Sequence, residues 1–110
     1  MALESLDKVD AVGIENDTGF VIITIADNWD WEDEHKHLLA LQAKLNAYFA
    51  FVESGQIWDT YPKALGRHLV IDVVGKFPIP QLGTDLLKRA SNVSDELGIS
   101  IRSRHIPEKL

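Results

Sequence analysis

The order of apolar and polar residues along the chain predicts four strands and two helices. Two apolar stretches within residues 9–25 flank the turn-forming segment 15–19, which predicts a β-hairpin. The second stretch, residues 20–25, is nearly all β-branched or aromatic, as in a strand covered on most of both faces.

A long helix is predicted over residues 30–54. Asp27, Asn28 and Asp30 offer N-cap oxygens, and the acids that follow suit the positive end of the helix dipole. Gly55 suits the left-handed position that ends a helix. Apolar side chains recur at helical spacing, at Trp31, Leu38, Leu41, Leu45, Tyr48, Phe49 and Val52.

The second half of the chain adds a strand, a helix and a strand. Residues 56–67 show no clean period, which predicts a structured loop or a short helical turn. Residues 68–77 and 99–106 alternate as strands, and apolar residues within 81–97 recur at steps of three and four, as in an amphipathic helix.

This β-β-α-β-α-β order predicts an α+β two-layer sandwich, with two helices on one face of a four-stranded mixed sheet. The last strand-helix-strand unit is expected to be a right-handed crossover between parallel strands. One face of the sheet then lacks a helical cover. At 110 residues, the chain is expected to form a single domain spanning residues 1–110.

Composition narrows the function classes. With 0 cysteines the chain has no disulfide, thiolate metal site or cysteine nucleophile. A net charge of -6 argues against direct nucleic-acid binding or attachment to a membrane surface. The start lacks a signal-peptide core, and the longest apolar run, residues 47–52, is too short to span a membrane. We therefore expect a cytoplasmic protein.

Several segments together resemble a family of small bacterial proteins known only as a domain of unknown function. They are VDAVGI at residues 9–14, ITIAD at 23–27, WEDE at 31–34, FVESG at 51–55, YPKA at 61–64 and Gly66-Arg67. The resemblance covers most of the chain. It implies a stand-alone domain of this length and assigns no activity and no functional residue.

Charge is distributed unevenly along the chain. Residues 1–34 hold ten acids and one base, and the remaining residues carry a net charge of +3. Acids beside exposed aromatic rings suit docking onto a basic protein surface. In the alternative interpretation, the acids serve helix capping or an ordinary solvated face, and the rings belong to the core. The candidate partner-binding residues are Asp27, Trp29, Asp30, Glu32, Asp33 and Glu34, with Trp58 and Tyr61 from the loop.

An alternative site lies on the open face of the sheet. His68, Lys76, Arg102 and Arg104 outnumber Asp72 there, which would suit a small anionic ligand or self-association as a homodimer. Asp72 is also expected to pair with Arg102 or Arg104 across the two strands, as an ion-pair ladder.

Catalytic and metal sites find little support in the sequence. No nucleophile elbow, phosphate loop or paired-histidine motif is present, and Asp72 with His68 is only a distant acid/base candidate. His35 and His37 are two residues apart on the predicted helix and point away from each other, so they cannot share a metal ion. We predict no catalytic residues, no metal and no cofactor.

The expected function is therefore that of a non-enzymatic binding protein. An immunity-type or antitoxin-type inhibitor that covers a basic toxin domain fits the acidic, aromatic-containing segment. The alternative is a homodimer that binds a small anion on the basic sheet face.

Overall fold

Four strands form one open mixed sheet in chain order, β1-β2-β3-β4. β1 and β2 pair as the predicted antiparallel hairpin, whereas β2 with β3 and β3 with β4 pair in parallel. The computed structural model describes residue 3 and residues 9–106. Its elements are β1 (Ala11–Ile14), β2 (Val21–Asp27), α1 (Glu34–Glu53), α2 (Gln56–Thr60), the 3-10 turn η2 (Pro62–Ala64), β3 (Leu69–Gly75), α3 (Gln81–Glu96) and β4 (Ile99–His105).

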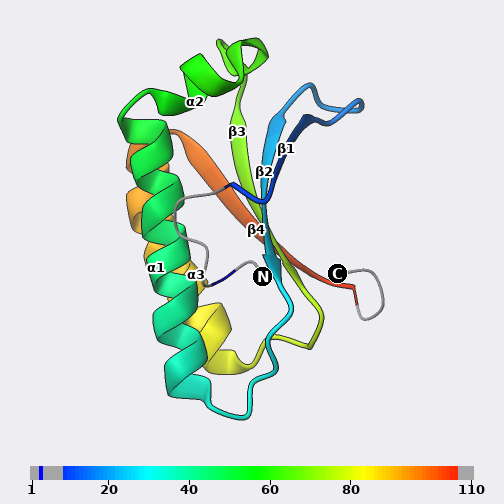
Figure 1. Cartoon of the computed structure of the whole chain (residues 1–110), viewed down its shortest axis with the longest axis vertical. Coiled ribbons are helices and arrows are strands. Elements are labelled where there is room, and N and C mark those ends of the chain that lie inside the picture. The colour runs from blue at the N-terminus through cyan, green and yellow to red at the C-terminus, as the bar shows by residue number, and fades with distance from the viewer. Residues whose placement is uncertain (1–2, 4–8, 107–110) are drawn as a thin grey trace.

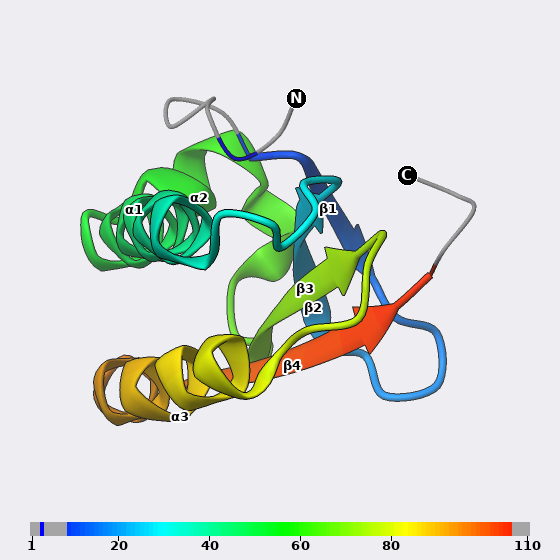
Figure 2. The same cartoon turned by 90° about the horizontal axis from the view of Figure 1, so that it is seen from below.

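Both long helices cover the same face of the sheet. Each parallel step, from β2 to β3 and from β3 to β4, runs in the same direction across the sheet, so right-handed crossovers place α1 and α3 on one side. Figure 2 shows the two helices together and the opposite face without a helix. The predicted α+β fold with an open sheet is therefore confirmed.

The core lies between the sheet and these helices. Val21, Ile23 and Ile25 alternate with half-buried residues along β2 and point into it. From α1 the core receives Leu41, Leu45, Tyr48, Phe49 and Val52. The apolar stripe of α1 also carries two buried polar residues, His37 and Lys44.

Buried polar groups near the middle of α1 are satisfied by the first hairpin. The Tyr48 hydroxyl donates to the Thr24 carbonyl and accepts from the backbone N–H of Asp10 at 2.9 Å. Burial raises the pKa of Tyr48 well above its usual value, so the hydroxyl stays neutral and keeps its donor proton. The Lys44 ammonium lies 3.2 Å from the Asp10 carboxylate. These bonds tie α1 to the β1–β2 hairpin.

The first helix begins later than predicted. The predicted span was 30–54, but α1 begins at Glu34, because the Asp33 carboxylate is the N-cap and accepts from the Lys36 N–H. The residues that we expected to supply the cap precede α1: Asp27 ends β2, and Asn28 and Asp30 lie in the loop that follows. Trp29 and Trp31 therefore do not lie on a helix, and placing Trp31 on the apolar stripe of the first helix was wrong.

The loop predicted over residues 56–67 contains α2 and η2, which close the end of the core that lies far from Asp33. Ile57 and Ala64 are fully buried there, and Trp58 and Tyr61 are half-buried against the same core. Gly55 has φ +81°, as predicted for the residue after α1. Within residues 3 and 9–106, no helix has the length and apolar character needed to cross a membrane.

The start of α3 packs tightly against the loop after β2. A Cβ added at Gly83 would lie 2.5 Å from Ile79 Cγ1 and 3.1 Å from the Trp31 ring. Gly83→Ala should therefore lower the free energy of unfolding by about 1–3 kcal/mol, although alanine is the better helix former. Urea unfolding measures the change. Asn92→Ala, at an exposed position of α3, is the control and should not destabilise; equal stability of G83A and wild type would contradict the tight packing.

Candidate functional site

The most elaborate polar arrangement in the described residues lies where β2 ends and α1 begins. Asp27, the last residue of β2, and His37, in the second turn of α1, are only 3% and 1% exposed. His37 Nε2 lies 2.6 Å from Asp27 Oδ2, and His37 Nδ1 lies 2.8 Å from the Asp30 carbonyl oxygen. The two side chains thus join the sheet, the loop and the helix.

The hydrogen-bond partners fix where the protons lie. A carbonyl oxygen only accepts, so Nδ1 of His37 must carry a proton and donate it to Asp30. The contact between Nε2 and Asp27 then holds one further proton, either on the ring or on the carboxyl group. Burial raises the pKa of Asp27, against the opposing effect of its hydrogen bond with His37. Either way the pair has no net charge, which suits its burial.

Both tryptophans of the loop pack on this pair. The Trp31 ring stacks on the His37 ring with centroids 3.5 Å apart and an interplanar angle of 12°, and the Trp29 ring lies tilted at 5.7 Å. The Asp27 carboxylate also accepts from the backbone N–H of Trp29 at 3.2 Å, and the Asp30 carboxylate accepts from the backbone N–H of Glu32 at 3.1 Å. The loop is therefore held along most of its length.

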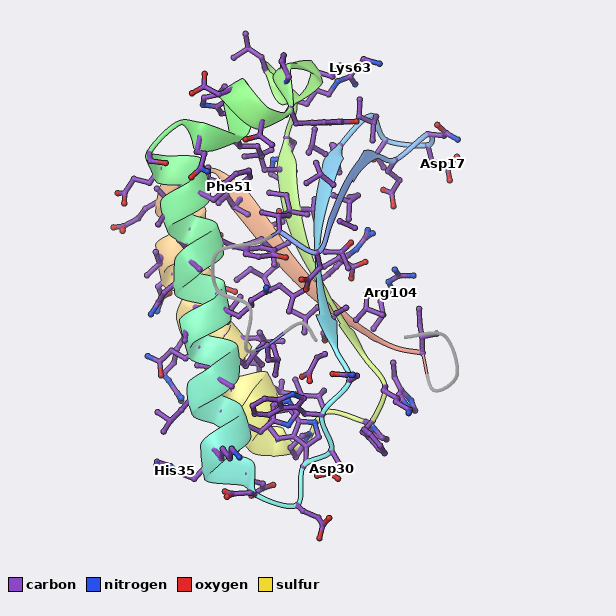
Figure 3. The ribbon with its side chains drawn as sticks, in the orientation of Figure 1. Asp17, Asp30, His35, Phe51, Lys63 and Arg104 are labelled. Atoms are coloured by element: carbon purple, nitrogen blue, oxygen red, sulfur yellow. The ribbon has the colours of Figure 1, made fainter. Side chains whose placement is uncertain are left out.

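We call residues 28–36, which are the loop after β2 and the first three residues of α1, the acidic loop. Its side chains line an open cleft of about 360 Å³, where the Lys36 ammonium lies 5.8 Å from the centre of the Trp29 ring. Figure 3 shows Asp30 and His35 at this end of α1, with Lys63 of η2 near the opposite end of the molecule. The cleft is lined by Asn28, Trp29, Asp30, Glu32, Asp33 and Lys36.

The structure brings together only part of the predicted partner-binding set. Trp29, Asp30, Glu32, Asp33 and Glu34 share the acidic loop, and all but Trp29 are exposed. Asp27 is buried against His37, so placing it on a contact surface was wrong.

Two further predicted partner-binding residues, Trp58 and Tyr61, belong to the opposite end of the molecule. α1 has 20 residues and separates them from the acidic loop by about 30 Å. Figure 1 shows α2 and the acidic loop at opposite ends of α1, so these two side chains cannot join one small site with the loop. Glu4 and Asp7, two of the ten acids, and the base Lys8 lie outside the described residues.

On the open sheet face, charges largely cancel. Asp72 is fully buried and contacts Arg104 Nη2 at 2.8 Å and Arg102 Nε at 3.4 Å, which confirms the predicted cross-strand pairing. Arg102 also lies 3.2 Å from Glu15, whose pKa is lowered by the Thr18 hydroxyl and by Arg102. Two carboxylates thus face two guanidinium groups.

The predicted anion-binding set does not converge. His68 precedes β3 and contacts Ser100 at 2.8 Å, whereas Lys76 follows β3, roughly 26 Å further along the strand direction. Only Arg102 and Arg104 lie together. Within residues 3 and 9–106, no three histidine, aspartate or glutamate side chains gather as a metal site would require.

His37 was missed as a site residue, although the sequence holds a signal for it. It stands four residues before Leu41 and continues the stripe of Leu41, Leu45, Tyr48 and Val52, which all face the core. A histidine on such a stripe must be buried with partners.

The chain belongs to DUF6572, a family of unknown function whose model matches residues 1–107. This confirms the predicted membership of a family of unknown function and adds no activity. No curated protein and no solved structure matches the chain.

Removing the Asp27 side chain should loosen the acidic loop. Asp27→Ala leaves His37 and the Trp29 N–H without their buried partner, so we expect a loss of about 2–3 kcal/mol in urea unfolding. Asp27→Asn can accept from Trp29 and donate to a neutral His37, and should cost only about 1 kcal/mol. Equal losses in the two variants would contradict the proposed proton arrangement.

The pH dependence of stability gives a separate test. Because the pKa of Asp27 is raised on folding, the folded protein holds this proton more tightly than the unfolded chain. The contribution of Asp27 is then largest below about pH 4 and is lost as the pH rises through the folded-state pKa. The stability of wild type relative to Asp27→Asn should fall from pH 4 to pH 7. A stability difference that grows from pH 4 to pH 7 would mean that ion pairing with His37 lowers the pKa of Asp27 more than burial raises it.

Proposed function

We propose that this protein is a cytoplasmic, non-enzymatic binding protein that docks onto a basic partner protein through the acidic loop. More specifically, we propose an immunity-type or antitoxin-type inhibitor of a basic toxin domain. The observation that carries the proposal is the acidic cleft in which an ammonium group lies over the Trp29 ring.

The cleft has the chemistry to receive a basic side chain. Lys36 occupies the position in which a guanidinium or ammonium group interacts favourably with an indole face. An arginine from a partner can replace Lys36 over the ring and pair with Glu32, whose carboxylate is exposed at the cleft. Asp33 and Glu34 add negative charge beside the cleft, which speeds association with a basic surface.

Preorganisation favours a recognition role for this loop. The bonds from Asp27, Asp30 and Asp33 to the backbone fix its course, and the stacked Trp31 and His37 rings hold it against the core. A loop fixed before binding loses less conformational entropy when a partner arrives.

The inhibitor class is proposed because an acidic surface can compete with nucleic-acid phosphates for a basic protein surface. Proteins that act on nucleic acids contact phosphates through lysine and arginine side chains. A small acidic protein with a rigid aromatic anchor can cover such a surface and exclude the phosphates. The alternative, a dimer that binds an anion on the open sheet face, has weaker support, because Asp72 and Glu15 already face Arg102 and Arg104.

Charge reversal at the cleft tests this proposal. The partner is first isolated by affinity capture on the tagged protein from a lysate of its own cells. Glu32→Lys should weaken the complex with this basic partner roughly tenfold, with a smaller salt dependence. Trp29→Ala should weaken it further, by roughly thirtyfold, as expected for an aromatic anchor. Titration of the purified partner at two salt concentrations measures both effects.

Glu96→Lys is the matched control, because it changes the net charge equally at an exposed position near the end of α3. It should leave affinity close to that of wild type. Co-expression should show that the wild type, and not Trp29→Ala, neutralises the partner's toxicity. Equal weakening by Glu32→Lys and Glu96→Lys, or the absence of a basic partner, would overturn the proposal.

A further inference from the structure

A second cleft lies on the other side of the acidic loop, at the carboxyl ends of the parallel strands β2, β3 and β4. It has a volume of about 230 Å³. A ligand site in this cleft would be independent of the function proposed above. Asp27 ends β2 at this cleft, Val73 comes from β3, and Ser103 from β4. In open sheets with parallel strands, ligands commonly bind outside the carboxyl ends of the strands.

Its walls combine apolar surface with one buried carboxyl group. Trp31, Val73, Phe77 and Ile79 supply aromatic and aliphatic surface, and Asp27 is 3% exposed. The described contacts of Asp27, with the Trp29 N–H and with His37, use two of the roughly four acceptor positions of a carboxylate. A ligand group that donates a hydrogen bond can therefore still pair with it.

The size of the cleft limits the ligand. Sites for drug-sized molecules measure about 300–1,000 Å³, so about 230 Å³ suits a single ring with a short substituent. The Asp27 side chain selects the substituent, because its remaining acceptor positions require a hydrogen-bond donor. The protein's net charge of -6 favours a cationic donor over an anionic group.

The one arginine at the cleft does not reverse this preference. Arg104 is bonded to the buried Asp72 through both Nε and Nη2. Figure 3 shows Arg104 on the side of the sheet away from α1.

We propose that this strand-end cleft is a binding site for a compact ring compound that bears an ammonium or amidinium group. The ring packs between Trp31, Val73 and Ile79, and the cationic group donates to Asp27. Ser103, exposed on β4, lies at the cleft and adds a hydroxyl group.

Three probes of similar size test the proposal: benzylamine, which is cationic, benzyl alcohol, which is neutral, and phenylacetate, which is anionic. Titrations followed by the indole N–H signal of Trp31 in ¹H–¹⁵N NMR spectra should give a Kd of about 1 mM for benzylamine. Benzyl alcohol should bind roughly tenfold more weakly and phenylacetate more weakly still. No binding of benzylamine at concentrations of roughly 10 mM, or equal binding of all three probes, would overturn the proposal.

Variants locate the site. Asp27→Asn should reduce benzylamine affinity roughly tenfold while leaving the affinity for benzyl alcohol nearly unaffected.

Ser103→Phe should block the cleft without touching the Asp27–His37 pair. Ser100→Phe, on the opposite face of the same strand, is the matched control and should bind like wild type. Glu32→Lys should also bind like wild type, so failure of partner binding and failure of this site remain distinguishable. Unchanged affinity in Ser103→Phe would place the ligand elsewhere and refute the site.

Discussion

The buried hydrogen bond between Asp27 and His37 is the interaction on which the candidate site depends. It joins the last residue of β2 to α1 across a loop that carries most of the exposed acids of this end. The same two side chains hold Trp29 and Trp31 on either side of the loop, toward the acidic cleft and the strand-end cleft. Each cleft is therefore walled by one tryptophan that packs on His37.

The open sheet explains why the two clefts occur at this end. Parallel pairing of β2, β3 and β4 places three carboxyl ends at one edge, and the crossovers bring the start of α1 and the start of α3 close to it. At the opposite edge, α2 and η2 close the core with Ile57 and Ala64. The uncovered sheet face carries a neutralised cluster of Glu15, Asp72, Arg102 and Arg104, so charge on that face contributes to register and solubility.

Much of the fold could be predicted, because it follows from local periodicity. The alternation in β3 and β4 was sufficient to predict the pairing of Asp72 with Arg102 or Arg104. The site was predicted only in part. Several residues that can cap a helix lie close together before α1. The sequence alone did not show that Asp33 would cap the helix, while Asp27 bonds to His37 and the Asp30 carboxylate bonds within the loop. The contact between residues 27 and 37 depends on the angle at which α1 crosses the sheet, which no periodicity encodes.

The protonation of His37 tests the central claim most directly. Long-range ¹H–¹⁵N NMR spectra of the imidazole ring distinguish a protonated from a bare ring nitrogen. The structure predicts a proton on Nδ1, bonded to the Asp30 carbonyl oxygen, and a second proton held between Nε2 and Asp27. A neutral ring with a bare Nδ1 would contradict the account, because the bond that anchors the acidic loop to α1 would then be absent.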